Sequence, residues 1–304
     1  MQLTQKIEYL EAVQTTPSPL GGPKIPPFIQ LFRLGFRLFG VLAPKQTASL
    51  AVRLFSTPRI RAKHKVSDVI MEKARIFEFL YAGKTLKAYE WGSGEQVVLL
   101  VHGWESRGTA LRSFVPGLLE KGFKVVAFDG PAHGNSSGKR TDLRHFGGAI
   151  RAIINHVGGV HSIIAHSFGG SSTLFTLTHI DRGITVDKLV LIASPADVTY
   201  VLKDFFQFIC LPTKARYYFK RKMEKRLGQP LEAANFKDSR HPEVKIGELL
   251  VIHDQEDAIV PMESSKLLIE NWDNARGVIS KGWGHYKLMK QPEILQRVGA
   301  FIAA

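Results

Sequence analysis

The chain has 304 residues, of which 44% are hydrophobic and 22% are charged. This composition is close to the average of globular proteins, so it excludes a wholly disordered or fibrous chain. At this length a large core can be buried without covalent cross-links. The single cysteine, Cys210, excludes an internal disulfide and a cysteine-rich zinc module, and it fits a reducing, cytoplasmic location.

The net charge of +14 is concentrated in two segments. Residues 1–65 contain ten Lys and Arg against two Asp and Glu, and residues 196–245 contain eleven against six. The rest of the chain is nearly neutral. Such an uneven distribution indicates an anionic partner or a contribution to solubility.

The N-terminal residues predict a tail followed by helices. The first 25 residues are mostly polar and rich in proline, which predicts a poorly ordered tail and not a signal peptide. No run of 18 uncharged apolar residues exists, so we predict no transmembrane helix. Residues 28–42 and 49–55 have amphipathic helical patterns, and Arg33 and Arg37 share one face of the first.

Two roles fit this basic, amphipathic extension over residues 1–65. Apolar helical faces mostly become buried, so we expect the helices to dock on the rest of the chain or on a second subunit. The alternative is that residues 28–65 lie on an anionic membrane surface, which would make the protein peripheral to the inner membrane.

From residue 75 onward, apolar strand-like runs alternate with helical patterns. The first two runs are joined by a short Ala-Gly turn, which predicts a hairpin. The alternation that follows predicts an α/β fold with a mostly parallel sheet and helices on both faces. The expected strands are residues 75–81, 84–91, 96–101, 124–129, 161–166, 188–194, 248–253 and 275–280, and the expected helices are residues 109–121, 142–156, 168–180, 262–271 and 286–303.

Residues 196–245 interrupt this alternation. About fifty residues separate two strands here, which is too long for a connecting loop, so we expect an inserted helical lid. The expected organisation is a helical extension over residues 1–65 and one α/β domain over residues 66–304 that carries this lid.

The most informative segment is a strand that runs directly into Ser167, then into glycines and a helix. A sharp strand–turn–helix bend forces the serine into a strained conformation, and it needs small neighbours because the two backbones nearly touch. Ala165 stands where glycine is commonest, and alanine is still small. The following helix points its N-terminus at the site and favours negative charge there. We therefore predict that Ser167 is a nucleophile.

A nucleophilic serine needs a base, and His285 lies in the loop after the last strand-like run. The carboxyl ends of the strands are where sites form in such sheets. An orienting acid is expected after the preceding strand, where Asp254, Glu256 and Asp257 are candidates. Asp257 is favoured because it lies farther into the loop, and Asp197 is a further alternative from an earlier strand end.

An oxyanion hole requires two N–H groups directed at one oxygen. The residue after the nucleophile, Phe168, supplies one, and Trp104, in the loop after residues 97–101, supplies the other. Gly103 lets the backbone turn toward the substrate, and His102 is expected to hydrogen-bond the backbone and shape the loop.

Taken together, these motifs resemble the α/β-hydrolase fold superfamily over residues 75–304, and within it the chain looks like uncharacterised bacterial hydrolases with a basic N-terminal helix. The motifs that carry the resemblance are His102-Gly103-Trp104, Asp129 to Ser136, Ala165 to Gly170, Asp254 to Pro261 and Gly284-His285. The resemblance implies Ser167 as nucleophile, Asp257 as acid and His285 as base, with the N–H groups of Trp104 and Phe168 as oxyanion donors. A serine at the nucleophile position argues against a dehalogenase or an epoxide hydrolase of this fold.

These residues predict a serine hydrolase, similar to carboxylesterases and lipases, that cleaves a small-molecule ester through an acyl-enzyme. Aromatic residues in the inserted segment suit an apolar acyl part, and we expect Phe205, Phe206 and Trp283 to contact substrate. The alternatives are a thioesterase, an acyltransferase or a carbon–carbon bond hydrolase with the same three residues, or a non-catalytic, membrane-associated binding protein.

No cofactor is expected. The histidines have no metal-binding spacing, so no metal site is predicted either. The basic segments lack interleaved aromatic residues, so nucleic-acid binding is not expected. The sequence leaves the oligomeric state open.

Overall fold

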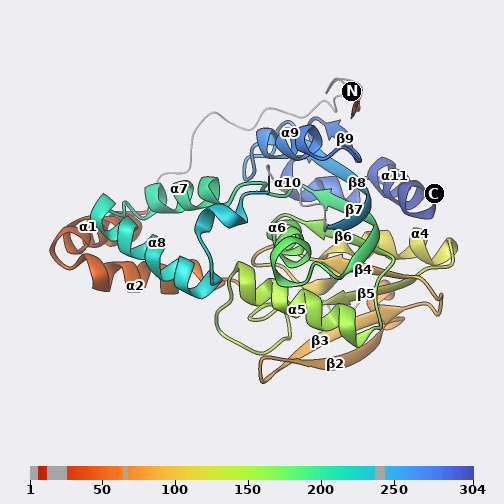
Figure 1. The fold of residues 1–304 in the computed structure, drawn as a ribbon, viewed down its shortest axis with the longest axis horizontal. Coiled ribbons are helices and arrows are strands. Elements are labelled where there is room, and N and C mark those ends of the chain that lie inside the picture. Colours follow the sequence, from red (N-terminus) through yellow and green to blue (C-terminus); the bar gives the residue numbers. More distant parts are fainter. Residues whose placement is uncertain (1–5, 12–25, 64–67, 237–243) are drawn as a thin grey trace. The chain divides into compact units, whose positions relative to one another are not determined.

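The computed structural model describes residues 6–11, 26–63, 68–236 and 244–304 (Figure 1). The chain forms two compact units, which we call the sheet unit and the helical unit. The sheet unit comprises Met1–Val13, Pro58–Ala196 and Phe236–Ala304, and the helical unit comprises Gln14–Thr57 and Asp197–Asn235. The helical unit therefore combines most of the N-terminal extension with most of the inserted segment.

Nine strands form one sheet, in the order β1-β9-β8-β7-β6-β4-β5-β3-β2 (Figure 1). Their bounds are β1 Ile7–Tyr9, β2 Arg75–Tyr81, β3 Lys84–Trp91, β4 Val97–Val101, β5 Lys124–Phe128, β6 Ser162–His166, β7 Thr185–Ile192, β8 Lys245–Asp254 and β9 Ala275–Ser280. β3 is antiparallel to β2 and β5, whereas all other neighbours are parallel. The predicted hairpin and the mostly parallel sheet are thus confirmed.

The order of the strands reverses next to β4. After β4 the chain proceeds to β5 on one side and then returns to β6 on the other side. In open parallel sheets, ligand sites form at such a reversal, outside the carboxyl ends of the strands. The loops that follow Val101 in β4 and His166 in β6 both start at this edge.

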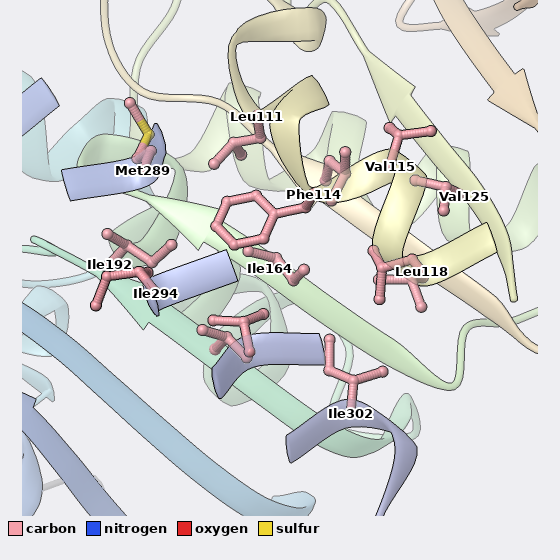
Figure 2. Close-up of a cluster of buried hydrophobic side chains, with 14 of the residues drawn as sticks. Leu111, Phe114, Val115, Leu118, Val125, Ile164, Ile192, Met289, Ile294 and Ile302 are labelled. Carbon is pink, nitrogen blue, oxygen red and sulfur yellow. The ribbon is translucent and has the colours of Figure 1, made fainter. Parts of the chain in front are cut away.

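Buried side chains fill the space between the sheet and the helices on each face. On one face, Phe114, Leu118 and Ile302 pack over Ile164 of β6 (Figure 2). Because side chains alternate across a strand, the equally buried Ile163 points to the other face. The helices that contribute to this first cluster are α3 Val69–Glu72, η2 Gly108–Phe114, α4 Val115–Glu120, η6 Leu288–Lys290 and α11 Pro292–Ala303, and the other helices of the unit are α5 Leu143–His156, α6 Phe168–Phe175, η3 Thr176–Ile180, α9 Met262–Asn271 and α10 Gly284–Lys287.

The expectation of a disordered tail is wrong for part of the N-terminus. Ile7–Tyr9 forms β1, which lies parallel to β9 at the edge of the sheet. The N–H of Gly277 donates to the carbonyl of Lys6 at 2.7 Å, and the N–H of Leu10 donates to the carbonyl of Ile279 at 2.8 Å. Residues 1–5 and 12–25, also expected in the tail, lie outside the described residues.

Each of the two chain segments of the helical unit contributes two α-helices among the described residues. Their bounds are α1 Pro27–Leu42, α2 Pro44–Phe55, α7 Val198–Phe208 and α8 Thr213–Leu227, followed by the short turn η4 Leu231–Ala234. The two N-terminal helices pack on each other and on α8 within this unit. Close approach requires glycine at one point: a Cβ at Gly40 would lie 2.4 Å from Cδ of Pro212.

Aromatic rings form the core of the helical unit. Phe219 of α8 is fully buried. The ring centroids of Phe55 and Phe205 lie 5.0 Å apart, and those of Phe206 and Phe219 are also 5.0 Å apart. Across both units, no helix in the described part of the chain is long and apolar enough to cross a membrane.

Candidate functional site

Ser167 lies at the bend between β6 and α6, as the sequence predicts. Its backbone has φ of 54° and ψ of −126°, a strained conformation for a residue with a side chain. The glycines that follow allow α6 to start against the sheet: a Cβ at Gly169 would lie 2.4 Å from the carbonyl oxygen of His102, and one at Gly170 would lie 2.0 Å from Oγ of Ser194. Any larger residue would push the helix away from the sheet.

The side chains of Ser167, His285 and Asp257 form one hydrogen-bonded chain. Nε2 of His285 lies 3.0 Å from Oγ of Ser167, and Nδ1 of His285 lies 2.7 Å from Oδ2 of Asp257. Because a carboxylate only accepts, Nδ1 carries the proton and Nε2 is left to accept from the serine hydroxyl. This tautomer is the one that a histidine needs to act as a base toward the serine.

Asp257 is held in its ionised form. Burial alone would raise the pKa of this carboxyl, but hydrogen bonds from His285 and from the backbone N–H groups of Val260 and Ile259 outweigh burial and lower the pKa. His253, which is fully buried, places Nε2 at 3.5 Å from Oδ2 of Asp257 and at 2.9 Å from the carbonyl oxygen of Val260. The carboxylate of Asp257 is therefore held by the loop that follows it, next to a second histidine.

Asp254, the nearest alternative acid, has different partners. Its carboxylate accepts hydrogen bonds from the hydroxyl of Ser280 at 2.6 Å and from the N–H of Trp283 at 3.0 Å. Burial alone would raise the pKa of the Asp254 carboxyl, but the hydrogen bonds that it accepts outweigh burial, and the pKa is lowered. The structure thus brings Asp257 to His285, whereas Asp254 anchors the loop that carries His285.

The structure places the two other alternative acids, Asp197 and Glu256, as follows. Asp197 caps the N-terminus of α7, where its carboxylate accepts from the N–H of Thr199 at 2.7 Å. Glu256 is exposed, and it follows Asp254 in the turn after β8.

The loop after β4 lies directly against Ser167. A Cβ at Gly103 would lie 3.0 Å from Cβ of Ser167. The neighbouring His102 accepts from the N–H of Gly130 through Nε2 at 2.9 Å, so its Nδ1 carries the proton and donates to the carbonyl of Gly103 at 2.7 Å. The prediction that His102 shapes this loop through backbone hydrogen bonds is confirmed.

The segments that carry the two expected oxyanion donors both adjoin Ser167. Phe168 is the first residue of α6, and the first N–H groups of a helix have no acceptor within it. The Trp104 ring meets the Phe168 ring edge to face, with centroids 5.2 Å apart. The segments that carry both N–H groups are therefore held next to each other by their side chains.

The expected substrate contacts fall in both units. Phe205 and Phe206 belong to α7, and both pack against Phe219 within the helical unit, at centroid distances of 5.9 Å and 5.0 Å. Trp283 belongs to the sheet unit, where it precedes His285 and packs partly buried against the core. Their assignment to substrate stays a prediction.

Sequence reasoning missed the residues that support the loop after Trp104. Glu105 has φ of 53° and donates its N–H to Nε2 of His133 at 3.0 Å. Its carboxylate accepts from Arg59, from the backbone N–H at 2.7 Å and from Nε at 3.1 Å. Arg61 donates to the carbonyls of Ser136 and Gly138 at 3.0 Å and 2.7 Å. No local sequence signal marks these contacts, because they join residues 28 to 77 positions apart.

Asp129, which the sequence marks only as part of a longer motif, connects the segments around the loop that follows β4. It is fully buried and accepts from the N–H of Gly108 at 2.7 Å, the N–H of Asn135 at 2.8 Å and the hydroxyl of Tyr89 at 2.9 Å. Within the described ranges, no group of three or more His, Cys, Asp or Glu side chains is arranged to hold a metal ion.

Solved structures share this fold at low sequence identity. An esterase from Pyrococcus furiosus gives a TM-score of 0.60 at 18% identity and covers 81% of this chain and 96% of its own. The alpha/beta hydrolase domain-containing protein 10 from mouse gives 0.59 at 18% identity, covering 75% and 97%. A thioesterase domain from the curacin biosynthetic pathway gives 0.55 at 16% identity, covering 76% and 99%. At these identities the likeness shows the fold.

Sequence comparison gives a family. A non-heme haloperoxidase from Rhodococcus erythropolis is 31% identical over 110 residues, which is 34% of this chain and 39% of that protein. The match therefore spans well under half of the length of this curated relative. The model of the alpha/beta hydrolase family matches residues 98–295, which is more than half of the chain and includes Ser167, Asp257 and His285. The protein thus belongs to the alpha/beta hydrolase family.

Proposed function

We propose that the protein is a serine hydrolase that cleaves carboxylic esters with an apolar acyl part. The observation that carries the proposal is the hydrogen-bonded chain from Asp257 through His285 to Ser167, at 2.7 Å and 3.0 Å. The strained backbone of Ser167 at the start of α6 supports it, because that geometry presents a serine hydroxyl to a substrate at the edge of the sheet.

In the first step, Oγ of Ser167 attacks the ester carbonyl while Nε2 of His285 takes the hydroxyl proton. Asp257 keeps the imidazole in the required tautomer and stabilises its charged form. The N–H groups of Trp104 and Phe168 donate to the oxygen that becomes negative. Such donors typically contribute 10²- to 10³-fold each to the rate, because they are already oriented when the charge develops.

In the second half of the reaction, the tetrahedral intermediate collapses and His285 gives its proton to the departing alkoxide, which leaves as an alcohol. The acyl group is then bound to Ser167 as an ester. His285 then removes a proton from a water molecule as the water oxygen attacks the acyl carbonyl. The second tetrahedral intermediate collapses, the bond between the acyl carbon and Oγ of Ser167 breaks, and Oγ takes the proton back from His285 as the carboxylic acid leaves. No metal or organic cofactor takes part in these steps.

Preference for an apolar acyl group rests on the side chains next to the nucleophile. Trp104 and Phe168 are both aromatic and contact each other beside Ser167. Tyr286, which follows His285, is 57% exposed and lies 4.9 Å from the imidazole by ring centroids. Aromatic walls with few polar groups suit an acyl chain better than a charged one.

The same three residues also serve related reactions. A thioesterase differs only in the leaving group, and one of the similar folds is a thioesterase domain. An acyltransferase differs in the acceptor that replaces water, and a carbon–carbon bond hydrolase differs in the bond that is cleaved. A non-catalytic binding protein would keep the fold without turnover.

The decisive experiment treats the purified protein with a fluorophosphonate probe and with p-nitrophenyl esters and acyl thioesters of increasing chain length. We expect labelling of Ser167 and turnover of esters, with a preference for longer acyl chains. Ser172→Ala is a matched control, because Ser172 lies on the same helix and its buried Oγ has no hydrogen-bond partner in the described structure. Labelling that survives in Ser167→Ala, or no labelling at all, would overturn the proposal. Faster turnover of thioesters than of esters would change the assigned substrate class.

A further inference from the structure

Helix α1 exposes a broad apolar face. Phe28 and Leu31 are each 71% exposed, and Leu42 is 78% exposed. The other large apolar side chains of this helix that are classed as exposed are Phe32, Leu34, Leu38, Phe39 and Val41. A contiguous exposed patch of this kind, on a helix of 16 residues, marks an interaction surface and not ordinary surface composition.

The same helix packs within its unit through a different, narrow face. Phe36 and Gly40 are its only buried residues in the described structure, and Nε of Arg33 donates to Sγ of Cys210 at 3.1 Å. At 3.6 residues per turn, positions 33, 36 and 40 lie together, and the exposed apolar positions lie on the opposite side. Docking of α1 on its neighbours in the helical unit therefore leaves its apolar face unused.

Positive charge is concentrated in the unit that carries this apolar face. The segment that forms α1 and α2 contains Arg33, Arg37, Lys45 and Arg53 and has no Asp or Glu. The whole helical unit contains thirteen Lys and Arg against four Asp and Glu. An open groove of about 530 Å³ in the same unit is lined mainly by cations, namely Lys45, Arg221, Lys222 and Lys225, together with Tyr218 and Glu224.

We propose that the helical unit docks on the surface of a bilayer that contains anionic phospholipid, with the apolar face of α1 inserted among the lipid chains. Leu50 and Leu54 of α2 are also exposed and extend the apolar surface. A helix with apolar side chains on one side and arginines at its margin lies in the plane of a membrane interface, where burial and electrostatic attraction act together. The unit binds in this way without crossing the membrane.

Charge decides between a membrane and a second copy of the chain. In a two-fold symmetric dimer through this face, Arg37 at its margin would lie near the cations of the other copy, with no acid from α1 or α2 to neutralise it. An anionic lipid surface matches both the apolar residues and the cations. The face therefore fits a membrane better than it fits itself.

The surface is smaller than residues 28–65, which the sequence indicated. Arg59 and Arg61 belong to the sheet unit, where their guanidinium groups are bonded to Glu105 and to backbone carbonyls of residues 132–138. Removal of residues 1–65 would also remove β1 from the sheet. Point substitutions on the exposed face test the proposal without damage to the sheet unit.

The experiment is co-sedimentation of the full-length protein with vesicles of phosphatidylcholine, with and without 30% phosphatidylglycerol, at about 0.05 and 0.5 M salt. We expect binding to the anionic vesicles only, with a marked decrease at high salt. The double variant Leu31→Glu/Leu38→Glu should bind at least about tenfold more weakly, because it places two carboxylates in the apolar face. Leu80→Glu is the matched control, since Leu80 is a leucine with 77% exposure in the sheet unit, and it should bind like the wild type.

Circular dichroism and fluorophosphonate labelling show whether each variant is folded, and sedimentation velocity reports the oligomeric state. The proposal is overturned if the wild type does not bind anionic vesicles at low salt, or if Leu80→Glu weakens binding as much as the double variant does. It is also overturned if the double variant changes a dimer into a monomer and leaves vesicle binding intact. Vesicle binding is measured without substrate, so its failure is separate from any failure of the proposed hydrolase activity.

Discussion

The side chain of His166 is bonded to the backbone of His285. Its Nε2 lies 3.0 Å from the carbonyl oxygen of His285, and the two rings lie 4.7 Å apart by their centroids. A carbonyl oxygen only accepts, so Nε2 of His166 carries a proton. Burial, and then the neighbouring His285, lower the pKa of His166 to about 3, so the ring is neutral near pH 7. The residue before Ser167 thus contacts the residue proposed to act as its base.

We predict that His166→Leu lowers kcat for a soluble ester by about 10- to 100-fold and changes KM little, because a small displacement of His285 is enough to slow proton transfer. His166→Gln keeps an N–H donor at this position and should restore part of the loss. Steady-state kinetics of both variants provide the measurement. Equal activity of His166→Leu and the wild type would show that the bond has no positioning role.

Ser167→Ala should reduce ester hydrolysis on the order of 10⁴- to 10⁶-fold, because no nucleophile remains. Thermal unfolding should be close to that of the wild type, since the change removes one hydroxyl. The hydrolysis rate of purified protein, corrected for the uncatalysed rate, checks the prediction. A residual rate within tenfold of the wild type would remove Ser167 from the mechanism.

Substitutions of Asp254 and Asp257, at the end of β8 and in the loop after it, should differ in their effects on kcat and on stability. Asp257→Asn should lower kcat by roughly 10⁴-fold, because the amide favours the wrong tautomer of His285. Asp254→Asn should cost much less in kcat but should lower the melting temperature, since Asp254 accepts buried hydrogen bonds from Ser280 and from the loop at Trp283. Kinetics and thermal unfolding of both variants test this ranking, and the opposite ranking in kcat would assign the acid to Asp254.

Stability should decrease on mild acidification. Burial, and then the neighbouring His102, lower the pKa of His133 to about 3, and the pKa of His166 is similarly low. An unfolded histidine has a pKa of about 6.5, so between about pH 6.5 and 3 the unfolded state binds more protons and the free energy of unfolding falls as pH falls. Each histidine contributes a slope of up to about 1.4 kcal/mol per pH unit. Urea unfolding between pH 6 and 4.5 should show a smaller slope for His133→Gln, and an unchanged slope would contradict the assignment.

Gly169→Ala should destabilise the sheet unit by about 2–4 kcal/mol, because its Cβ would overlap the carbonyl oxygens of His102 and Val101, at 2.4 Å and 2.7 Å. Gly117→Ala is a control on a helix where a Cβ meets nothing within 4 Å. Urea unfolding measures both. Equal stability of the two variants would show that α6 can move away from β4 at little cost.

Much of the sheet could be predicted because its signals are local. Each strand after residue 75 is an apolar run bounded by turn residues, and the helices between them have their own periodicity. The loop positions of Ser167 and His285 follow from the ends of those strands. The choice of Asp257 over Asp254 depended only on Asp257 lying three residues farther into the loop. The hydrogen bonds around each carboxylate give the physical reason for their difference.

What the sequence did not indicate depends on distant partners. β1 has only three residues, and its pairing with β9 joins positions about 270 residues apart. The packing of Gly40 on Pro212 joins the N-terminal helices to the inserted segment, and no local pattern marks it. The periodicity of α1 correctly predicts an amphipathic helix, but periodicity alone does not tell which face meets protein and which remains exposed.

The ion pair between Arg59 and Glu105 supports the backbone next to Trp104. Only Pro58 separates Arg59 from Thr57, the last residue of the N-terminal part of the helical unit. Arg59 holds Glu105 through its backbone and its guanidinium, and Glu105 adjoins Trp104 in a left-handed conformation that its neighbours must maintain. Loss of this ion pair would therefore free the backbone of Glu105, one residue from a proposed oxyanion donor.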